Sequence, residues 1–228
     1  MTGQSLHLDR VNKIYGTGPG AVHAVRDFDL EVGAGEIVAL LGSSGCGKTS
    51  TLRMIAGFEA VTSGSIRLGD TEVHQKKPAR RGVAMAFEGY SLYPPLTVRE
   101  NITVSLKSQG VGAAEIETRL AEIAALLEIE NILDRYPAEL SGGQQQRAGL
   151  GRALIREAGL HLLDEPMGQL EPQLRALLRG RIKHFIKERG LTAILVTHDQ
   201  TEANALADRI AVMEDGELQQ FGTPKELK

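Results

Sequence analysis

The sequence contains one cysteine, no excess of basic residues and no long apolar segment. A single cysteine, Cys46, rules out an internal disulfide bond and agrees with a reducing cytoplasm. The longest apolar runs are about six residues, whereas a membrane-spanning helix needs roughly 20, so we expect no segment to cross a bilayer by itself. Lysine and arginine number 26 against 29 acidic residues, which gives no basic field for nucleic acid.

With 228 residues and 42% apolar content, the chain can build a hydrophobic core in one large domain or two small ones. Its most informative stretch is the loop Gly42-Ser43-Ser44-Gly45-Cys46-Gly47-Lys48-Thr49. This loop fits the pattern G-x-x-x-x-G-K-[ST], whose backbone turns tightly and presents N–H groups to phosphate oxygens. Lys48 supplies positive charge to the β- and γ-phosphates, and the Thr49 hydroxyl is placed to ligate Mg²⁺.

The segments on either side of this loop support phosphate binding. Residues 37–41 are a continuous apolar run typical of a buried strand, and residues 49–55 can continue as a helix. The positive end of that helix points at a bound anion. Cys46 has no chemical task in such a loop and is a small spacer; were it accessible, a thiol reagent should block nucleotide binding.

Two further strand ends carry polar side chains. The apolar run 160–163 leads into Asp164 and Glu165, which suit Mg²⁺ and a water, with Asp164 for the ion and Glu165 as general base. The alternative is an acidic turn that only ends the strand. Residues 193–197 form another buried strand that ends at His198, whose ring can donate to phosphate oxygens, although a lone histidine is usually structural.

A second glycine-rich segment, Leu140-Ser141-Gly142-Gly143-Gln144, opens a helix that we expect to run to about residue 156. Ser141 and Gln144 fit a capping box, and the two glycines leave the start of the helix without side chains. Bare N–H groups at such a helix end can receive an anion. Taken alone, the segment is an ordinary capped helix start.

Residues 6–11 and 28–32 alternate apolar and polar side chains, as half-buried antiparallel strands do. Between them, Tyr15 precedes a glycine-rich loop, where an aromatic ring can lie against adenine. The alternative is that Tyr15 only packs at the end of a strand.

Residues 82–87 form a nearly continuous apolar strand that delivers Glu88 to its carboxyl end, where ligands gather in open α/β sheets. The segment from Glu88 to Leu96 also holds Tyr90, Tyr93 and two prolines, which exclude a regular helix. Its aromatic side chains are either a docking surface for a partner or a cap that folds back onto the domain.

Two segments show the periodicity of amphipathic helices. In the first, residues 115–127, the apolar positions are Ile116, Leu120, Ile123 and Leu127. In the second, the apolar side chains predicted to share one face are Leu170, Leu174, Leu177, Leu178, Ile182, Phe185 and Ile186.

Together these segments resemble the nucleotide-binding subunit of ATP-binding-cassette (ABC) transporters over essentially the whole chain. The resemblance assigns nucleotide binding to Tyr15, which stacks on adenine, to the phosphate loop Gly42 to Thr49 with Ser50, and to the signature sequence, residues 140–144. It assigns magnesium binding to Thr49, Glu88 and Asp164. The implied catalytic residues are Glu165 as the base, His198 as the switch histidine and Glu88 at the position of the water sensor. The pentapeptide between a phosphate loop and an Asp-Glu strand end makes this resemblance specific.

The resemblance implies one ATP-binding domain, residues 1–228, of the α/β class. Its parts are a P-loop NTPase core with a mostly parallel sheet and flanking helices, an N-terminal antiparallel β subdomain, and an inserted helical subdomain at about 89–156. ATP and Mg²⁺ are the implied cofactors, and the implied activity is ATP hydrolysis coupled to transport.

The implied partners are a second ATP-binding subunit and membrane permease subunits. Two ATP-binding subunits close head to tail, so that each signature helix caps the γ-phosphate held by the other subunit. The permease docks between Glu88 and Leu96, which favours the docking interpretation of Tyr90 and Tyr93. The protein is therefore expected in the cytoplasm, peripheral on the inner face of the cell membrane, and no nucleic acid partner is expected.

Three segments, residues 53–57, 93–98 and 197–203, look like the carbohydrate-importer branch of this family, which implies import of sugars or related polyols. Two positions depart from the family pattern. Glu88 stands where glutamine is expected, and its charge either binds Mg²⁺ more strongly or repels the γ-phosphate. Glu171 stands where aspartate is expected, facing the opposing subunit. An alternative is therefore a hydrolysis-impaired subunit that pairs with a distinct active ATPase subunit.

Overall fold

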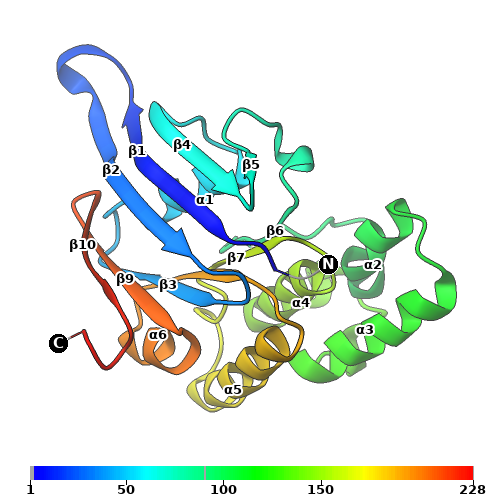
Figure 1. The fold of residues 1–228 in the computed structure, drawn as a ribbon. Helices are drawn as coiled ribbons and strands as arrows, with labels where there is room; N and C mark the ends of the chain where they lie inside the picture. The colour runs from blue at the N-terminus through cyan, green and yellow to red at the C-terminus, as the bar shows by residue number, and fades with distance from the viewer. Residues whose placement is uncertain (1–2, 90, 228) are drawn as a thin grey trace.

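The computed structural model describes residues 3–89 and 91–227. Two sheets organise this part of the chain (Figure 1). The larger sheet has the strand order β10 (Glu217–Gly222), β9 (Arg209–Glu214), β3 (Ile37–Leu41), β8 (Ala193–Thr197), β7 (Leu160–Asp164) and β6 (Val83–Ala86). The smaller sheet has the order β2 (Val22–Val32), β1 (Leu6–Tyr15), β4 (Ser63–Leu68) and β5 (Thr71–Glu72).

The larger sheet is mostly parallel. Strand β3 pairs in parallel with β8 and β9, and β7 pairs in parallel with β6 and β8, while β10 is antiparallel to β9. Every residue of β7 and β8 is buried, as expected for parallel strands that are covered on both faces. The carboxyl ends of β3, β6, β7 and β8 therefore meet at one edge of the sheet, and the polar residues that follow them lie there.

The helices cover the larger sheet and fill the space beside it (Figure 1). They are α1 (Lys48–Ala56), α2 (Val98–Ser108), α3 (Ala113–Leu127), α4 (Gly142–Leu154), α5 (Pro172–Glu188) and α6 (Gln200–Leu206). Short 3₁₀ turns occur at Gly18–Gly20, Pro78–Arg80, Glu130–Ile132 and Pro137–Glu139. No helix of the described residues is both long and apolar enough to span a bilayer.

Two hydrophobic cores hold these layers together. One unites α1 with the antiparallel sheet and one face of the larger sheet, through residues such as Phe28, Leu52 and Ile194. The other joins the opposite face to the helices α2 to α6, through residues such as Leu120 and Leu178. Helix α1 and the phosphate loop before it are thus fixed between the two sheets.

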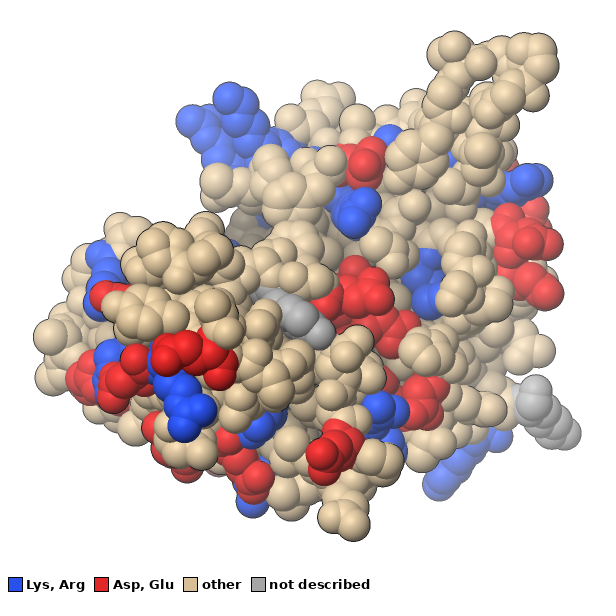
Figure 2. Space-filling model, turned by 180° about the vertical axis from the view of Figure 1, so that it is seen from behind, with Lys and Arg blue, Asp and Glu red and all other residues tan. Residues whose placement is uncertain are grey.

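The predicted α/β fold, with its mostly parallel sheet, flanking helices and N-terminal antiparallel sheet, is confirmed. Helices α2, α3 and α4 fall between residues 98 and 154, whereas the division of the chain into subdomains stays a prediction. One predicted core position is wrong: Leu177 is 44% exposed, because α5 packs through the neighbouring rows of residues and turns Leu177 outward. Figure 2 shows lysine and arginine side chains interspersed with acidic ones across one face of the molecule.

Candidate functional site

The phosphate loop connects β3 to α1 and encloses its own lysine. Lys48 is only 6% exposed, and its Nζ donates to the carbonyl oxygens of Gly42 at 2.7 Å and Ser43 at 2.8 Å. Helix α1 begins at Lys48 with Gly47 as its N-cap, and no side chain caps it. Its first backbone N–H groups are therefore available to an anion, with a positive charge beside them.

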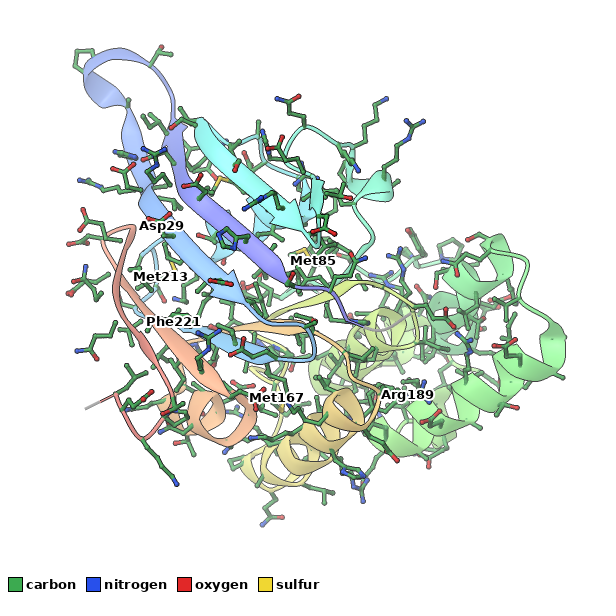
Figure 3. The ribbon with its side chains drawn as sticks, in the orientation of Figure 1. Asp29, Met85, Met167, Arg189, Met213 and Phe221 are labelled. Carbon is green, nitrogen blue, oxygen red and sulfur yellow. The ribbon has the colours of Figure 1, made fainter. Side chains whose placement is uncertain are left out.

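Two glycines of this loop are required by packing as well as by phosphate binding. A Cβ on Gly42 would lie 2.3 Å from the carbonyl oxygen of Met213, a residue of β9 labelled in Figure 3. A Cβ on Gly47 would lie 2.5 Å from the carbonyl oxygen of Ala24 in β2. Backbone this close leaves no space for a side chain, so both sheets fix the shape of the loop.

Cys46 is a spacer in this loop. It is 4% exposed and belongs to the core beneath the antiparallel sheet, and its Sγ lies 3.7 Å from Lys48 Nζ. The condition for blocking the site with a thiol reagent, an accessible thiol, is not met.

Tyr15 lies at the end of β1, next to the phosphate loop. Its hydroxyl donates to Ser50 Oγ at 3.2 Å, so the structure brings together two of the predicted nucleotide-binding residues. Lys13 Nζ lies 4.6 Å from the centre of the Tyr15 ring and is itself fixed by the carbonyl oxygen of Ala60 and by Glu59, each at 2.9 Å. This cation–π contact supports the ring from behind, and nothing in the sequence pattern pointed to Lys13.

Asp164 ends β7 as a buried carboxylate with an unsatisfied oxygen. The residue is 4% exposed, and its Oδ1 has no hydrogen-bond partner among the described residues. Burial, followed by the negative charges of Glu88 and Glu165, raises the pKa of Asp164 to about 6. A buried carboxylate oxygen without a hydrogen-bond partner costs free energy. A hard divalent cation, which prefers oxygen ligands, would satisfy it.

Glu165 adopts a strained backbone conformation and contacts the predicted histidine. Its φ is +46°, in the left-handed region that residues with a side chain rarely occupy. Its Oε1 lies 2.8 Å from Nδ1 of His198, which donates because a carboxylate only accepts. The hydrogen bond and the charge of Glu165 raise the pKa of His198 above its ordinary value.

Gln146, a residue of α4 that the sequence analysis did not identify, holds the backbone around Glu165. It is 5% exposed; its Nε2 donates to the carbonyl oxygen of Glu165 at 2.9 Å, and its Oε1 accepts from the N–H of Gln169 at 2.9 Å. Both ends of one amide are thus used to join α4 to the segment after β7. The only signal in the sequence was a polar residue on the buried face of a helix.

The turn that presents His198 is also braced by residues that escaped sequence analysis. Thr197 Oγ1 donates to Oε2 of the buried Glu202 at 2.6 Å and accepts from the N–H of Asp199 at 3.1 Å. The Asp199 carboxylate in turn caps α6, accepting from the N–H of Thr201 at 2.7 Å. These bonds fix the direction in which His198 leaves β8.

A cavity of about 410 Å³ gathers many of the predicted site residues. Its lining comprises Ala24, Ser44, Gly45, Gly47, Lys48, Thr49, Ser50, Glu88, Gln146, Glu165, Gly168, Gln169, Val196 and His198. The glycine-rich loop, the predicted base and the predicted switch histidine therefore open onto one space.

The signature segment does not line this cavity. Ser141 Oγ accepts from the N–H of Gln144 at 3.3 Å, and Gln144 Oε1 accepts from the N–H of Ser141 at 3.0 Å, so the predicted capping box is confirmed. Ser141 and Gly142, at the start of α4, are exposed. Glu171 is also exposed, as the N-cap of α5 without a side-chain hydrogen bond to that helix.

Comparison with known proteins identifies this arrangement. A family model described as ABC transporter matches residues 25–168. The chain belongs to the ABC transporter family. It is 47% identical over 220 residues to the sn-glycerol-3-phosphate import ATP-binding protein UgpC of Brucella abortus, a match that covers 96% of this chain and 62% of that protein.

Two further members of the ABC transporter family are similar to the same degree. The sulfoquinovosyl glycerol transport ATP-binding protein SmoE of Agrobacterium fabrum is 46% identical, over 98% of this chain and 61% of that protein. The trehalose import ATP-binding protein SugC of Mycobacterium tuberculosis is 47% identical, over 96% of this chain and 55% of that protein. The chain thus spans about three fifths of the length of the curated relatives it matches.

Solved structures of ABC cassettes share the whole fold. A dimeric post-hydrolysis state of an ATP-binding cassette bound to ADP and Pi has a TM-score of 0.88 and 28% sequence identity, covering 96% of this chain and 98% of that chain. A dimeric bacterial ABC transporter cassette has a TM-score of 0.89, also at 28% identity and with the same coverage. In both cases the similarity extends over the two sheets and the helices between them.

Proposed function

We propose that this chain is the ATP-binding and ATP-hydrolysing subunit of an importer of sugars or related polyols. The observation that carries the proposal is the placement of Lys48, Glu165 and His198 around one cavity. The names of the relatives give the substrate class, because they refer to glycerol-3-phosphate, sulfoquinovosyl glycerol and trehalose.

The phosphate loop and Tyr15 fit ATP. Residues 42–50 offer backbone N–H groups, the Lys48 ammonium and the hydroxyls of Thr49 and Ser50 to the phosphates. Lys48 turns from the carbonyl oxygens of Gly42 and Ser43 to the β- and γ-phosphates, so its charge stays inside the loop. Tyr15, backed by Lys13, offers the outer face of its ring to adenine.

Asp164, Glu88 and Thr49 fit a magnesium ion. The fit rests on the unsatisfied Oδ1 of Asp164, on the Glu88 charge that reaches it and on the Thr49 hydroxyl in the cavity lining. When bound, Mg²⁺ neutralises phosphate charge and orients the phosphate chain.

Glu165 acts as the general base toward the attacking water. Its Oε1 is oriented by His198, and its backbone is held by Gln146, so the carboxylate keeps one direction within the cavity. A positioned carboxylate base contributes roughly 10²–10⁴-fold to such a reaction. His198 also holds a proton that its ring can donate to a phosphate oxygen.

A second ATP-binding subunit completes the site. Helix α4 begins with two glycines, and its exposed start does not line the cavity of its own chain. The free backbone N–H groups at this helix start suit capping of a γ-phosphate held by another subunit. The dimeric assemblies of the structural neighbours support this arrangement. The alternative, a hydrolysis-impaired subunit paired with an active one, is favoured by the extra carboxylate of Glu88 beside Asp164.

The segment after Glu88 suits docking of a permease. Its backbone is fixed, because Asn101 Oδ1 accepts from the N–H of Tyr93 at 2.7 Å and its Nδ2 donates to the Tyr93 carbonyl oxygen at 3.1 Å. The Tyr93 ring is nevertheless 53% exposed, and Phe58 is 54% exposed. Both line a groove of about 330 Å³ together with Met85, whose position on β6 is labelled in Figure 3.

An exposed aromatic groove on a rigid backbone favours the docking interpretation over a folded-back cap. Tyr90, the other aromatic residue of this interpretation, lies outside the described residues. A permease at this groove would place the protein peripherally on the inner face of the cell membrane.

The proposal is tested with the purified chain and radiolabelled or fluorescent nucleotides. ATP should bind with Mg²⁺, and phosphate should be released in proportion to the square of the protein concentration when dimerisation is weak. Lys48→Ala should abolish both binding and release. Binding of ATP with no phosphate release at any protein concentration would support the hydrolysis-impaired alternative, and absence of binding would reject the proposal.

A further inference from the structure

The two carboxylates at the predicted magnesium site leave neighbouring strands at the same edge of the sheet. Strands β6 and β7 are parallel, with Ala86 opposite Leu163. Asp164 follows Leu163 directly, and Glu88 follows Ala86 by two residues. Glu88 and Glu165, the residue after Asp164, line the same cavity. The strand register and this shared cavity therefore place Glu88 and Asp164 at the same edge of the sheet.

Asp164 carries a buried carboxylate oxygen that accepts no hydrogen bond from the described part of the chain. The residue is more than nine-tenths buried, with 4% exposed, and the oxygen without a partner among residues 3–89 and 91–227 is Oδ1. The charges of Arg53 and Lys48 act on Asp164, but neither side chain donates a hydrogen bond to Oδ1. Lys48 Nζ donates to the carbonyl oxygens of Gly42 and Ser43. Glu165, by contrast, has His198 as its partner.

The remaining donor is a neutral oxygen. Thr49 lies in the same cavity lining as Glu88 and belongs to the first turn of α1. Two carboxylates, one hydroxyl and several waters form an oxygen set suited to a six-coordinate divalent cation. Within the described residues no three acidic, histidine or cysteine side chains gather closely enough to hold a metal, so water fills the other positions.

We propose that Glu88 and Asp164 hold a divalent cation before any nucleotide binds. The proposal rests on the magnesium site of the proposed function and goes beyond it. With a neutral amide in place of Glu88, only the Asp164 carboxylate would carry charge among the proposed ligands, and cation binding would then depend on the nucleotide phosphates. With both carboxylates and a divalent cation, the formal charges cancel. Repulsion of the γ-phosphate by Glu88 is thereby removed whenever the cation is present.

The first experiment measures Mn²⁺ binding to the nucleotide-free full chain by the electron paramagnetic resonance signal of free Mn²⁺. The wild-type chain should bind one Mn²⁺, and Glu88→Gln should weaken this binding on the order of tenfold or more, since ligand charge sets affinity at oxygen sites. Asp164→Asn should act in the same direction. Glu72→Gln, which removes an exposed carboxylate on β5, is the matched control and should leave Mn²⁺ affinity unchanged.

The second experiment measures ATP binding in EDTA and in Mg²⁺. Glu88→Gln should bind ATP more tightly than the wild-type chain in EDTA, by about tenfold, because the uncompensated carboxylate repels phosphate. In Mg²⁺ the two proteins should differ by less. Glu88 is exposed, so this variant is expected to fold, and a circular dichroism melt checks that it does.

Two results would overturn the inference. One is the absence of Mn²⁺ binding without nucleotide, and the other is equal Mn²⁺ affinity in the wild-type and Glu88→Gln chains. Neither result touches the proposed function if the same samples bind and hydrolyse Mg²⁺-ATP. Failure to bind Mg²⁺-ATP rejects the proposed function, and the Mn²⁺ titration then still decides whether Glu88 and Asp164 form a cation site.

Discussion

His198 Nδ1 lies 2.8 Å from Glu165 Oε1, and this bond joins the carboxyl ends of β8 and β7. The backbone N–H of Glu165 also donates to the carbonyl oxygen of Val196 at 3.0 Å, so the two strand ends are joined twice. Glu165, the proposed base, is thus held in a strained backbone, φ +46°, by a side chain that can itself carry a proton.

This pair predicts the titration of His198. Glu165 raises the pKa of His198 above its ordinary value of 6.5, so the charge-assisted bond is complete below that value and is lost as the pH rises through the raised pKa. Histidine signals in a nuclear magnetic resonance titration should show one such elevated pKa, which Glu165→Gln returns toward its ordinary value. An unchanged His198 titration in Glu165→Gln would exclude the pairing in solution.

Asp164→Asn should stabilise the nucleotide-free chain in EDTA while removing a proposed magnesium ligand. The pKa of Asp164 is about 6 in the folded chain against an ordinary value of 3.8, so its ionisation disfavours folding most strongly above about pH 6. We expect a gain in unfolding free energy of about 1–2 kcal/mol near pH 8. The gain should shrink as the pH falls from 6 toward 4, and a gain that is independent of pH would show that charge is not its cause.

Tyr15→Ala should weaken ATP binding by about tenfold, because stacking on a base contributes about 1–3 kcal/mol. Tyr15→Phe is the matched control: it keeps the ring and loses only the bond to Ser50 Oγ. The chain contains no tryptophan, so Tyr15→Trp introduces a single fluorophore whose emission should change when ATP binds. Equal ATP affinity of the Ala and Phe variants would show that the ring does not stack.

Gln146→Leu should lower kcat for ATP hydrolysis by about tenfold with little change in KM, because it releases the backbone of Glu165 and Gln169 without touching the phosphate loop. Arg147→Ala is the matched control on the same helix. Arg147 donates to the carbonyl oxygens of Leu127 and Glu128, so its loss should lower thermal stability and leave kcat nearly unchanged. Parallel losses of stability and kcat in both variants would make Gln146 purely structural.

The strands, the helices and the phosphate loop could be predicted because their signals are local. Residues 42–49 are contiguous, and the capping box from Ser141 to Gln144 spans four residues, so neither needs a distant contact. The buried parallel strands are recognised from continuous apolar runs. The helical repeat wrongly predicted that Leu177 is buried, since the repeat alone does not say how wide the buried face of a helix is.

The supporting residues of the site could not be predicted, because their partners are backbone atoms distant in the sequence. Gln146 bonds the carbonyl oxygen of Glu165, and Lys13 bonds that of Ala60. Every residue has such a carbonyl group, so no residue pattern marks these contacts. Hydrogen bonds between two side chains could not be predicted either. Thr197 and Glu202 form one only because the turn before α6 brings them together.

Single-turnover phosphate release from Mg²⁺-ATP, measured in the wild-type chain and in Glu165→Gln at equal nucleotide occupancy, tests the role of Glu165 most directly. Glu165→Gln should bind ATP with wild-type affinity and release phosphate roughly 10²–10⁴ times more slowly. Equal release rates in the two proteins would show that Glu165 is not the base and would contradict the mechanism proposed for this cavity.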